Sequence, residues 1–138
     1  MAVRGLIIAL ALAGLANALY FTLAYYGRVR KSRWVPEVLC AREGSSCVTV
    51  VQTPYARVFG LPNSLLGIAY YMLVMGWLLA GPAIAPAWLP RALVAASAGT
   101  VAFGFYLIHA LRSKLHVNCP LCYAAHAINL GIFMLLLV

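Results

Sequence analysis

The sequence predicts an all-α membrane protein, a four-transmembrane-helix bundle with a long cysteine-bearing loop between the first two helices. Of its 138 residues, 65% are hydrophobic and only 9% are charged. A soluble domain carries roughly 45–50% apolar and about 25% charged residues. A single small core cannot bury so much apolar surface, so the surplus is expected to face lipid. We predict one integral-membrane domain over residues 1–138, because a chain of this length rarely divides.

The first predicted span is an uncharged apolar run over residues 6–26. It is long enough to cross about 30 Å of hydrocarbon at about 1.5 Å per residue. Asn17, flanked by two alanines, also resembles a signal-peptide cleavage site, but the run continues well past it, which disfavours cleavage. Turn residues and short connections predict an antiparallel bundle. The remaining predicted spans are residues 61–80, 92–111 and 120–138.

The long polar segment, residues 27–60, is the predicted redox loop, and it holds the first two of the four cysteines. The cysteines fall into two pairs, Cys40 with Cys47 and Cys119 with Cys122. With four spans, this loop and the turn before the last span lie on the same side of the membrane. All four thiols therefore share one membrane face, where the pairs can meet.

Cys119 and Cys122 open the fourth span, with Pro120 between them. Proline is favoured at the first helical position, which puts Cys119 near the N-cap and Cys122 in the first turn. A helix N-terminus favours the thiolate, the reactive form of cysteine. This pattern favours a redox pair over metal ligation. Since the pair opens into a lipid-facing bundle, a hydrophobic two-electron acceptor such as a quinone is the natural partner.

Cys40 and Cys47 enclose six residues of the polar loop. In the active interpretation they form a shuttle: one accepts electrons from an outside dithiol and the other passes them to the helical pair by thiol–disulfide exchange. A static disulfide that staples the loop is one alternative. A zinc site made by all four thiols is another, although it would need a tighter spacing of the loop pair.

Residues 46–62, SCVTVVQTPYARVFGLP, and the following NSLLG, together with the arrangement of spans and cysteines, resemble the vitamin K epoxide reductase family in its microbial, quinone-reducing form. The resemblance covers nearly the whole chain. It implies a membrane dithiol:quinone oxidoreductase that oxidises a thioredoxin-like partner, reduces a menaquinone- or ubiquinone-type quinone and supports disulfide-bond formation. By this resemblance Cys122 reduces the quinone, Cys119 exchanges with Cys47, and Cys40 meets the partner.

Two further residues are candidates for quinone binding. Asn63 matches a family asparagine that hydrogen-bonds a quinone carbonyl; the alternative is an N-cap of the second span. His126 stands four residues after Cys122, where animal members carry a tyrosine that contacts the quinone. This spacing puts both on one helix face. A histidine can donate a hydrogen bond or a proton, or it can be a satisfied buried side chain. Because of this departure, we do not expect vitamin K epoxide to be a substrate.

One other redox family and two other functional classes are alternatives. The bacterial quinone-dependent thiol oxidases of the disulfide-forming pathway carry their Cys-x-x-Cys in the first loop, so the reversed order here disfavours them. A non-catalytic scaffold with structural disulfides has no need of a Cys-x-x-Cys at a helix start opposite a second pair. A thiol-lined metal transporter would usually carry acids or bases in its spans, where this chain has only His109 and His126.

The net charge of +8 does not indicate nucleic-acid binding, because the basic residues lie between apolar runs. Eight Lys and Arg residues fall on the predicted cysteine side, and two, Arg4 and Arg91, on the other. The positive-inside rule therefore predicts a multi-pass cell-membrane protein whose cysteine face is cytoplasmic. Members of the family usually face their cysteines to the oxidising side, so this orientation is inverted. A cytoplasm-facing oxidase would suit a hyperthermophile, because intracellular disulfides are common in such cells.

Overall fold

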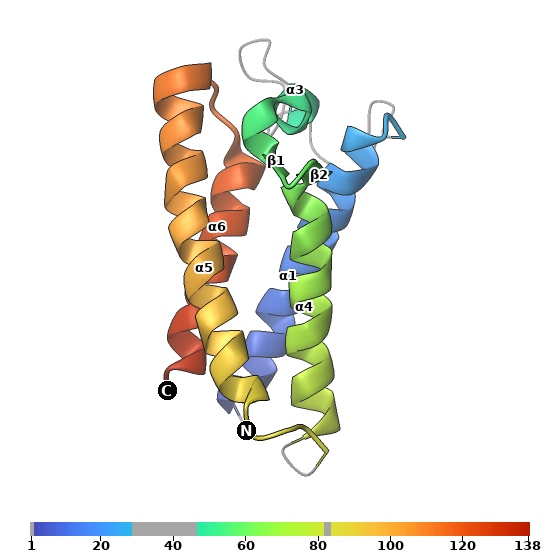
Figure 1. The fold of residues 1–138 in the computed structure, drawn as a ribbon, viewed down its shortest axis with the longest axis vertical. Coiled ribbons are helices and arrows are strands. Elements are labelled where there is room, and N and C mark those ends of the chain that lie inside the picture. Colours follow the sequence, from blue (N-terminus) through green and yellow to red (C-terminus); the bar gives the residue numbers. More distant parts are fainter. Residues whose placement is uncertain (1, 29–46, 82–83) are drawn as a thin grey trace.

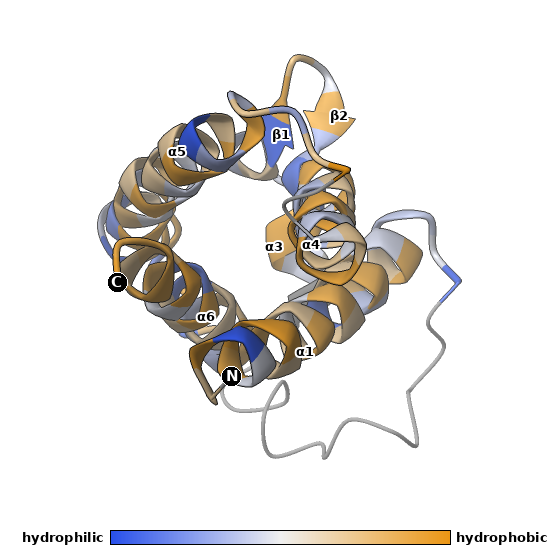
Figure 2. Cartoon of the chain, turned by 90° about the horizontal axis from the view of Figure 1, so that it is seen from below, coloured by the Kyte–Doolittle hydropathy of each residue, from blue (hydrophilic) through white to orange (hydrophobic). Residues whose placement is uncertain are grey.

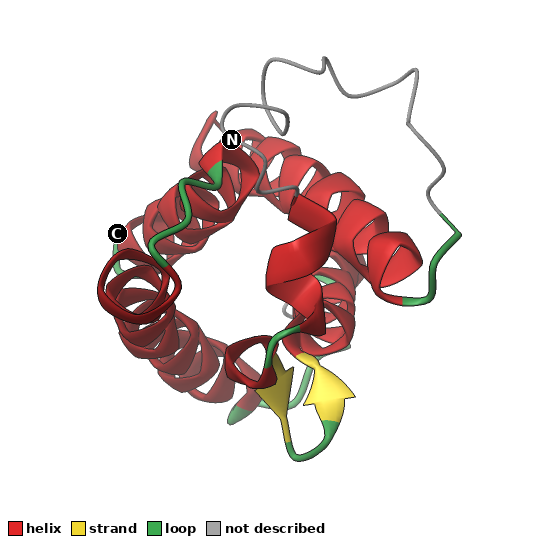
Figure 3. Ribbon diagram, turned by 90° about the horizontal axis from the view of Figure 1, so that it is seen from above, coloured by secondary structure: helices red, strands yellow, loops and turns green. Residues whose placement is uncertain are grey.

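The computed structural model describes residues 2–28, 47–81 and 84–138, which form a bundle of long helices (Figure 1). Their bounds are Ala2–Tyr25 for α1, Asn63–Ala80 for α4, Leu89–Ala110 for α5 and Pro120–Leu136 for α6. α1 contacts both α4 and α6, and α6 also contacts α5. Seen along the bundle, the helices stand in a ring (Figure 3), and their order around it is α4, α1, α6, α5 (Figure 2). The two chain ends lie at the same end of the bundle.

Three of these helices are long and apolar enough to cross a membrane: α1, α4, and α5 with the π-helical turn η3 (Leu111–Leu115) that continues it. α6 is apolar but shorter, with 17 residues. Large apolar side chains such as Leu12, Met72 and Phe105 are exposed on the outside of the bundle, whose helices are hydrophobic along much of their length (Figure 2). So much exposed apolar surface marks contact with lipid. The predicted all-α membrane class is therefore confirmed.

The helix ends follow local rules. α5 begins at Leu89, slightly before the predicted start at 92, and Pro90 stands in its first turn, where a missing N–H costs no hydrogen bond. α4 begins at Asn63 rather than at 61 because residues 61 and 62 pair as a short strand. It ends before Gly81, whose φ of +77° suits glycine.

Residues 47–62, the end of the predicted redox loop and the first two residues of the predicted second span, form short elements. They are α3 (Cys47–Gln52), the 3-10 turn η2 (Pro54–Ala56), and the antiparallel strands β1 (Arg57–Val58) and β2 (Leu61–Pro62). Phe59 and Gly60 form the two-residue turn between the strands, and both have the positive φ that such turns require. Residues 29–46, which include Cys40, lie outside the described residues.

Two buried apolar clusters hold the bundle together. The larger one joins α1, α4, α5 and α6 and includes Ala11, Val74, Leu93 and Ile132. The second joins the other end of α1 to α3, η3 and the start of α6; it consists of Phe21, Ala24, Val50, Val51, Leu111 and Cys119. This second cluster fixes α3 over the start of α6, where the second cysteine pair lies (Figure 1).

Candidate functional site

The start of α6 is a turn built around a disulfide. Cys119 is the N-cap, Pro120 is the first helical residue, and the Cys119 sulfur accepts a hydrogen bond from the N–H of Cys122 at 3.3 Å. The disulfide joins Cys119 to Cys122, and their Cα atoms are 5.3 Å apart. The predicted placement of these two cysteines at the helix start is confirmed.

The Cys119 side chain is closed off from solvent. It is 1% exposed and belongs to the cluster that includes Val50 and Val51 of α3. A soluble protein thiol therefore cannot reach its sulfur while α3 stays in place. α3 begins at Cys47, so the backbone of Cys47 lies in the element that covers Cys119. Cys40 lies outside the described ranges.

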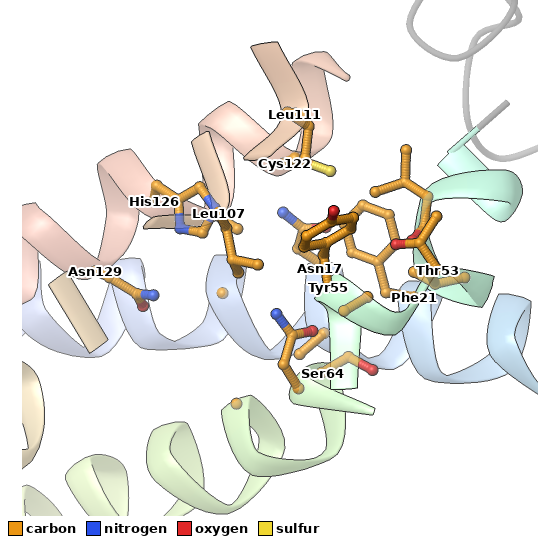
Figure 4. Close-up of a pocket in the computed structure, with 18 of the residues that line it drawn as sticks. Asn17, Phe21, Thr53, Tyr55, Ser64, Leu107, Leu111, Cys122, His126 and Asn129 are labelled. Carbon is orange, nitrogen blue, oxygen red and sulfur yellow. The ribbon is translucent and has the colours of Figure 1, made fainter. Parts of the chain in front are cut away.

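Beneath α3, the helices surround a cavity of about 110 Å³ (Figure 4). Its wall is mostly apolar with a few polar side chains, which is typical of sites for small organic ligands. An engineered protein cavity of about 150 Å³ binds benzene, so the cavity is on the scale of a single aromatic ring. Cys122 presents its sulfur here, and Asn63 and His126 also line the wall. The structure thus brings together three of the residues singled out from the sequence.

Asn63 is the first residue of α4 and does not cap it. The N-cap is Pro62, and no side chain makes a capping hydrogen bond there. The alternative role of Asn63 as the N-cap of the second span is therefore wrong. Asn63 lines the cavity instead.

His126 lies where the cavity meets two grooves on the outside of the bundle, one between α5 and α6 and one between α4 and α5. It shares the cavity wall with Cys122, as the four-residue spacing predicted. Gly104 of α5 leaves room for the imidazole, because a Cβ at this position would lie 2.8 Å from His126 Nδ1. The close approach of α5 to α6 therefore sets the position of the ring.

Two buried polar atoms of the cavity wall lack a hydrogen-bond partner within the described part of the chain. Among the residues that the structure describes, the buried side-chain atoms without a hydrogen bond are Asn17 Oδ1 and His126 Nδ1. Both side chains line this same cavity. Buried polar atoms are nearly always hydrogen-bonded in proteins. The two atoms therefore identify the cavity as a place where a polar group of a ligand can bind.

Three residues of this region escaped sequence reasoning: Asn17, Tyr55 and Gly104. Asn17 lines the cavity from α1, and Tyr55 lines it from η2 (Figure 4). An amide inside an uncharged apolar span is itself a signal, since polar groups in spans are expensive and usually functional. No such signal marks Gly104, whose role depends on a side chain of another helix.

Comparison with known proteins places this site in a family. A family model described as "Vitamin K epoxide reductase family" matches residues 5–137. The chain is also 32% identical to vitamin K epoxide reductase complex subunit 1 of Mus musculus over 142 aligned positions, which cover 93% of this chain and 84% of the mouse protein. Together with the apolar helices and the Cys119–Cys122 disulfide, these matches establish that the chain belongs to the vitamin K epoxide reductase family and is a membrane oxidoreductase.

Proposed function

We propose that the protein is a dithiol:quinone oxidoreductase, which oxidises a thioredoxin-like partner, reduces a membrane quinone and so supports protein disulfide-bond formation. One observation carries the proposal: Cys122 is half of a disulfide and also lines an apolar cavity with Asn63 and His126. When the Cys119–Cys122 dithiol closes to the disulfide, it releases two electrons and two protons. A quinone that takes up both becomes a hydroquinone, and two partner thiols then reduce the disulfide again.

The burial of Cys119 supports an internal relay. Because α3 covers Cys119, electrons from a soluble partner have to enter through another cysteine of this chain. In the proposed route Cys40 meets the partner, Cys47 at the start of α3 exchanges with Cys119, and Cys122 faces the quinone.

The cavity suits the ring of a menaquinone- or ubiquinone-type quinone. The Asn63 amide can donate a hydrogen bond to a ring carbonyl, and His126 can donate a hydrogen bond or a proton. The groove between α4 and α5 offers the apolar tail a way to the lipid, because these neighbouring helices pack little against each other. The groove shares with the cavity the residues Asn63, Gly67, Leu107, His126 and Asn129. With His126 in place of a tyrosine, we do not expect vitamin K epoxide to be a substrate.

Replacement of Gly104 by alanine tests the contribution of His126. The added Cβ is expected to push the imidazole out of its place, since it would come within 2.8 Å of Nδ1. We expect quinone reduction to fall by roughly tenfold, the effect of about one hydrogen bond, in steady-state kinetics with a saturating dithiol donor. Gly76→Ala on α4 is the matched control, because a Cβ there meets nothing within 4 Å and Gly76 lines neither the cavity nor the two grooves. Equal rates for the two variants would contradict a role of His126 in the reaction.

We also propose that α6 crosses the membrane, which makes four crossings. Its 17 residues span roughly 26 Å at about 1.5 Å per residue, within a few ångströms of the hydrocarbon core. Such a mismatch has only a modest cost. The positions of the chain ends at one end of the bundle support an even number of crossings. This arrangement gives both cysteine pairs the same membrane face.

The charge distribution supports a cytoplasmic cysteine face. Eight of the ten Lys and Arg residues belong to this side of the predicted topology, and such residues are retained on the inside. Labelling of intact cells with a membrane-impermeant maleimide, after reduction, is expected to leave Cys40 unmodified until the cells are lysed. A triple variant that keeps Cys40 as its one cysteine makes the readout unambiguous. Rapid labelling without lysis would place the cysteine face outside.

Quinone reduction by the purified protein in lipid nanodiscs tests the proposed activity. With a reduced thioredoxin-like dithiol as donor, we expect the ultraviolet absorbance of the quinone to decline with stoichiometric oxidation of the donor. Menaquinone and ubiquinone analogues should be compared. If the oxidised donor accumulates with none of them, the quinone proposal is wrong.

A further inference from the structure

Asn17 is a polar residue in the middle of an apolar helix. The 24 residues of α1 form one of the candidate membrane spans, and an amide there is costly unless it is used. Thr22, five residues further along α1, shows the ordinary solution. Its hydroxyl contacts the Ala18 carbonyl at 2.8 Å and the Ser64 hydroxyl at 2.9 Å, so it is fully satisfied within the protein.

Only one side of the Asn17 amide is satisfied in this way. Asn17 Nδ2 donates a hydrogen bond to the carbonyl of Leu121 at 2.9 Å. Leu121 stands between Cys119 and Cys122 in the turn that opens α6, which we call the redox turn. This hydrogen bond therefore links α1 to the redox turn. It also sets the orientation of the amide, because a flipped side chain would bring Oδ1 against the Leu121 carbonyl, and both are acceptors. Oδ1 is thereby left as a buried acceptor without a partner in the described structure.

The chemistry of this acceptor matches one redox form of the ligand better than the other. A quinone carbonyl only accepts hydrogen bonds, whereas the hydroxyl of a hydroquinone donates one. Asn17 lines the cavity that Cys122 faces, and its oxygen can only accept. An acceptor in this place therefore favours the ligand after it has received its electrons and protons.

We propose that Asn17 is a binding residue for the reduced ligand, whose Oδ1 accepts a hydrogen bond from a hydroxyl of the hydroquinone beside Cys122. The inference rests on the proposed quinone chemistry. It adds one binding residue to the site and a preference of the site for the hydroquinone. By stabilising the product in the site, Asn17 favours transfer of the electron pair from the dithiol to the ring. Asn63, which can turn its amide N–H toward a carbonyl, serves the oxidised form.

The test compares the two ligand forms in a protein that cannot convert them. In a Cys122→Ser background, menadione and, under anaerobic conditions, menadiol are titrated against the purified protein in nanodiscs. Asn17→Leu, which is close in size but lacks both polar atoms, is expected to weaken menadiol binding by roughly fivefold to tenfold. Menadione binding should change by less than about twofold. Gly5→Ala, on the same helix but away from the cavity, should leave both affinities unchanged.

If the Asn17→Leu variant does not fold, Asn17→Ala replaces it in the test. Asn17→Ala should show the same selective loss of menadiol affinity. Equal losses for the two ligand forms, or no loss at all, would overturn the inference and indicate a structural or water-binding amide. Failure of the parent to bind either form would refute the quinone function itself. The failure of this inference and the failure of the proposed function thus give different results.

Discussion

Cys122→Ala is expected to abolish quinone reduction, with a loss of roughly a thousandfold or more in turnover. Cys122 is the redox-turn sulfur that faces the cavity, while Cys119 is buried under α3. Without Cys122 the dithiol cannot close, so no electron pair is available for the ring. Stopped-flow or steady-state measurement of quinone absorbance, with the dithiol donor present, checks this result.

The same variant separates catalysis from stability. The Cys119–Cys122 disulfide closes a loop of sequence separation 3, and a loop this short contributes only about 2 kcal/mol through the unfolded state. We therefore expect the variant to remain folded, with a modest fall in thermal midpoint. Cys119→Ala should lose turnover as well, because the dithiol again cannot close. Substantial turnover in Cys122→Ala would show that the quinone takes its electrons elsewhere.

Gly14→Ala is expected to destabilise the bundle by about 1–3 kcal/mol, the usual cost of overpacking. A Cβ at Gly14 would overlap the ring of Tyr71, which is 3% exposed, so the ring or the helix has to shift. Tyr71 also donates a hydrogen bond from its hydroxyl to Asn129 Oδ1 at 2.7 Å, so its displacement disturbs the cavity wall. Unfolding of the variant in detergent, followed by circular dichroism, measures the loss.

Gly5→Ala is the matched control, since it makes the same substitution in the same helix and meets nothing within 4 Å. In a helix interior this change favours the helix by up to about 1 kcal/mol, so the control should be neutral or stabilised. If Gly14→Ala were as stable as Gly5→Ala, the result would contradict the close contact between Gly14 of α1 and the Tyr71 ring of α4.

Several features of the protein were predictable from the sequence because they depend on neighbouring residues. The apolar runs predict lipid-facing helices, and Pro120 predicts a helix start with Cys119 as its N-cap, which the structure confirms. The cysteine pattern and residues 46–67 predict the family, which the comparisons confirm. The cavity position of Cys122 and His126 likewise follows from their spacing along one helix face.

Other features were decided only by the tertiary structure, because they depend on contacts between residues far apart in the chain. In α1 the sequence does not distinguish Asn17 from Thr22 as a residue with a free polar atom; the positions of Ser64 and Leu121 on other helices make the difference. Gly14 and Gly104 are sites of close approach, while Gly5 and Gly99 face open space. The sequence by itself thus determined the helices, the redox turn and the family. Which side chains meet around the cavity was decided by helix packing, since the free energy of a buried polar atom depends on the partners that other helices bring to it.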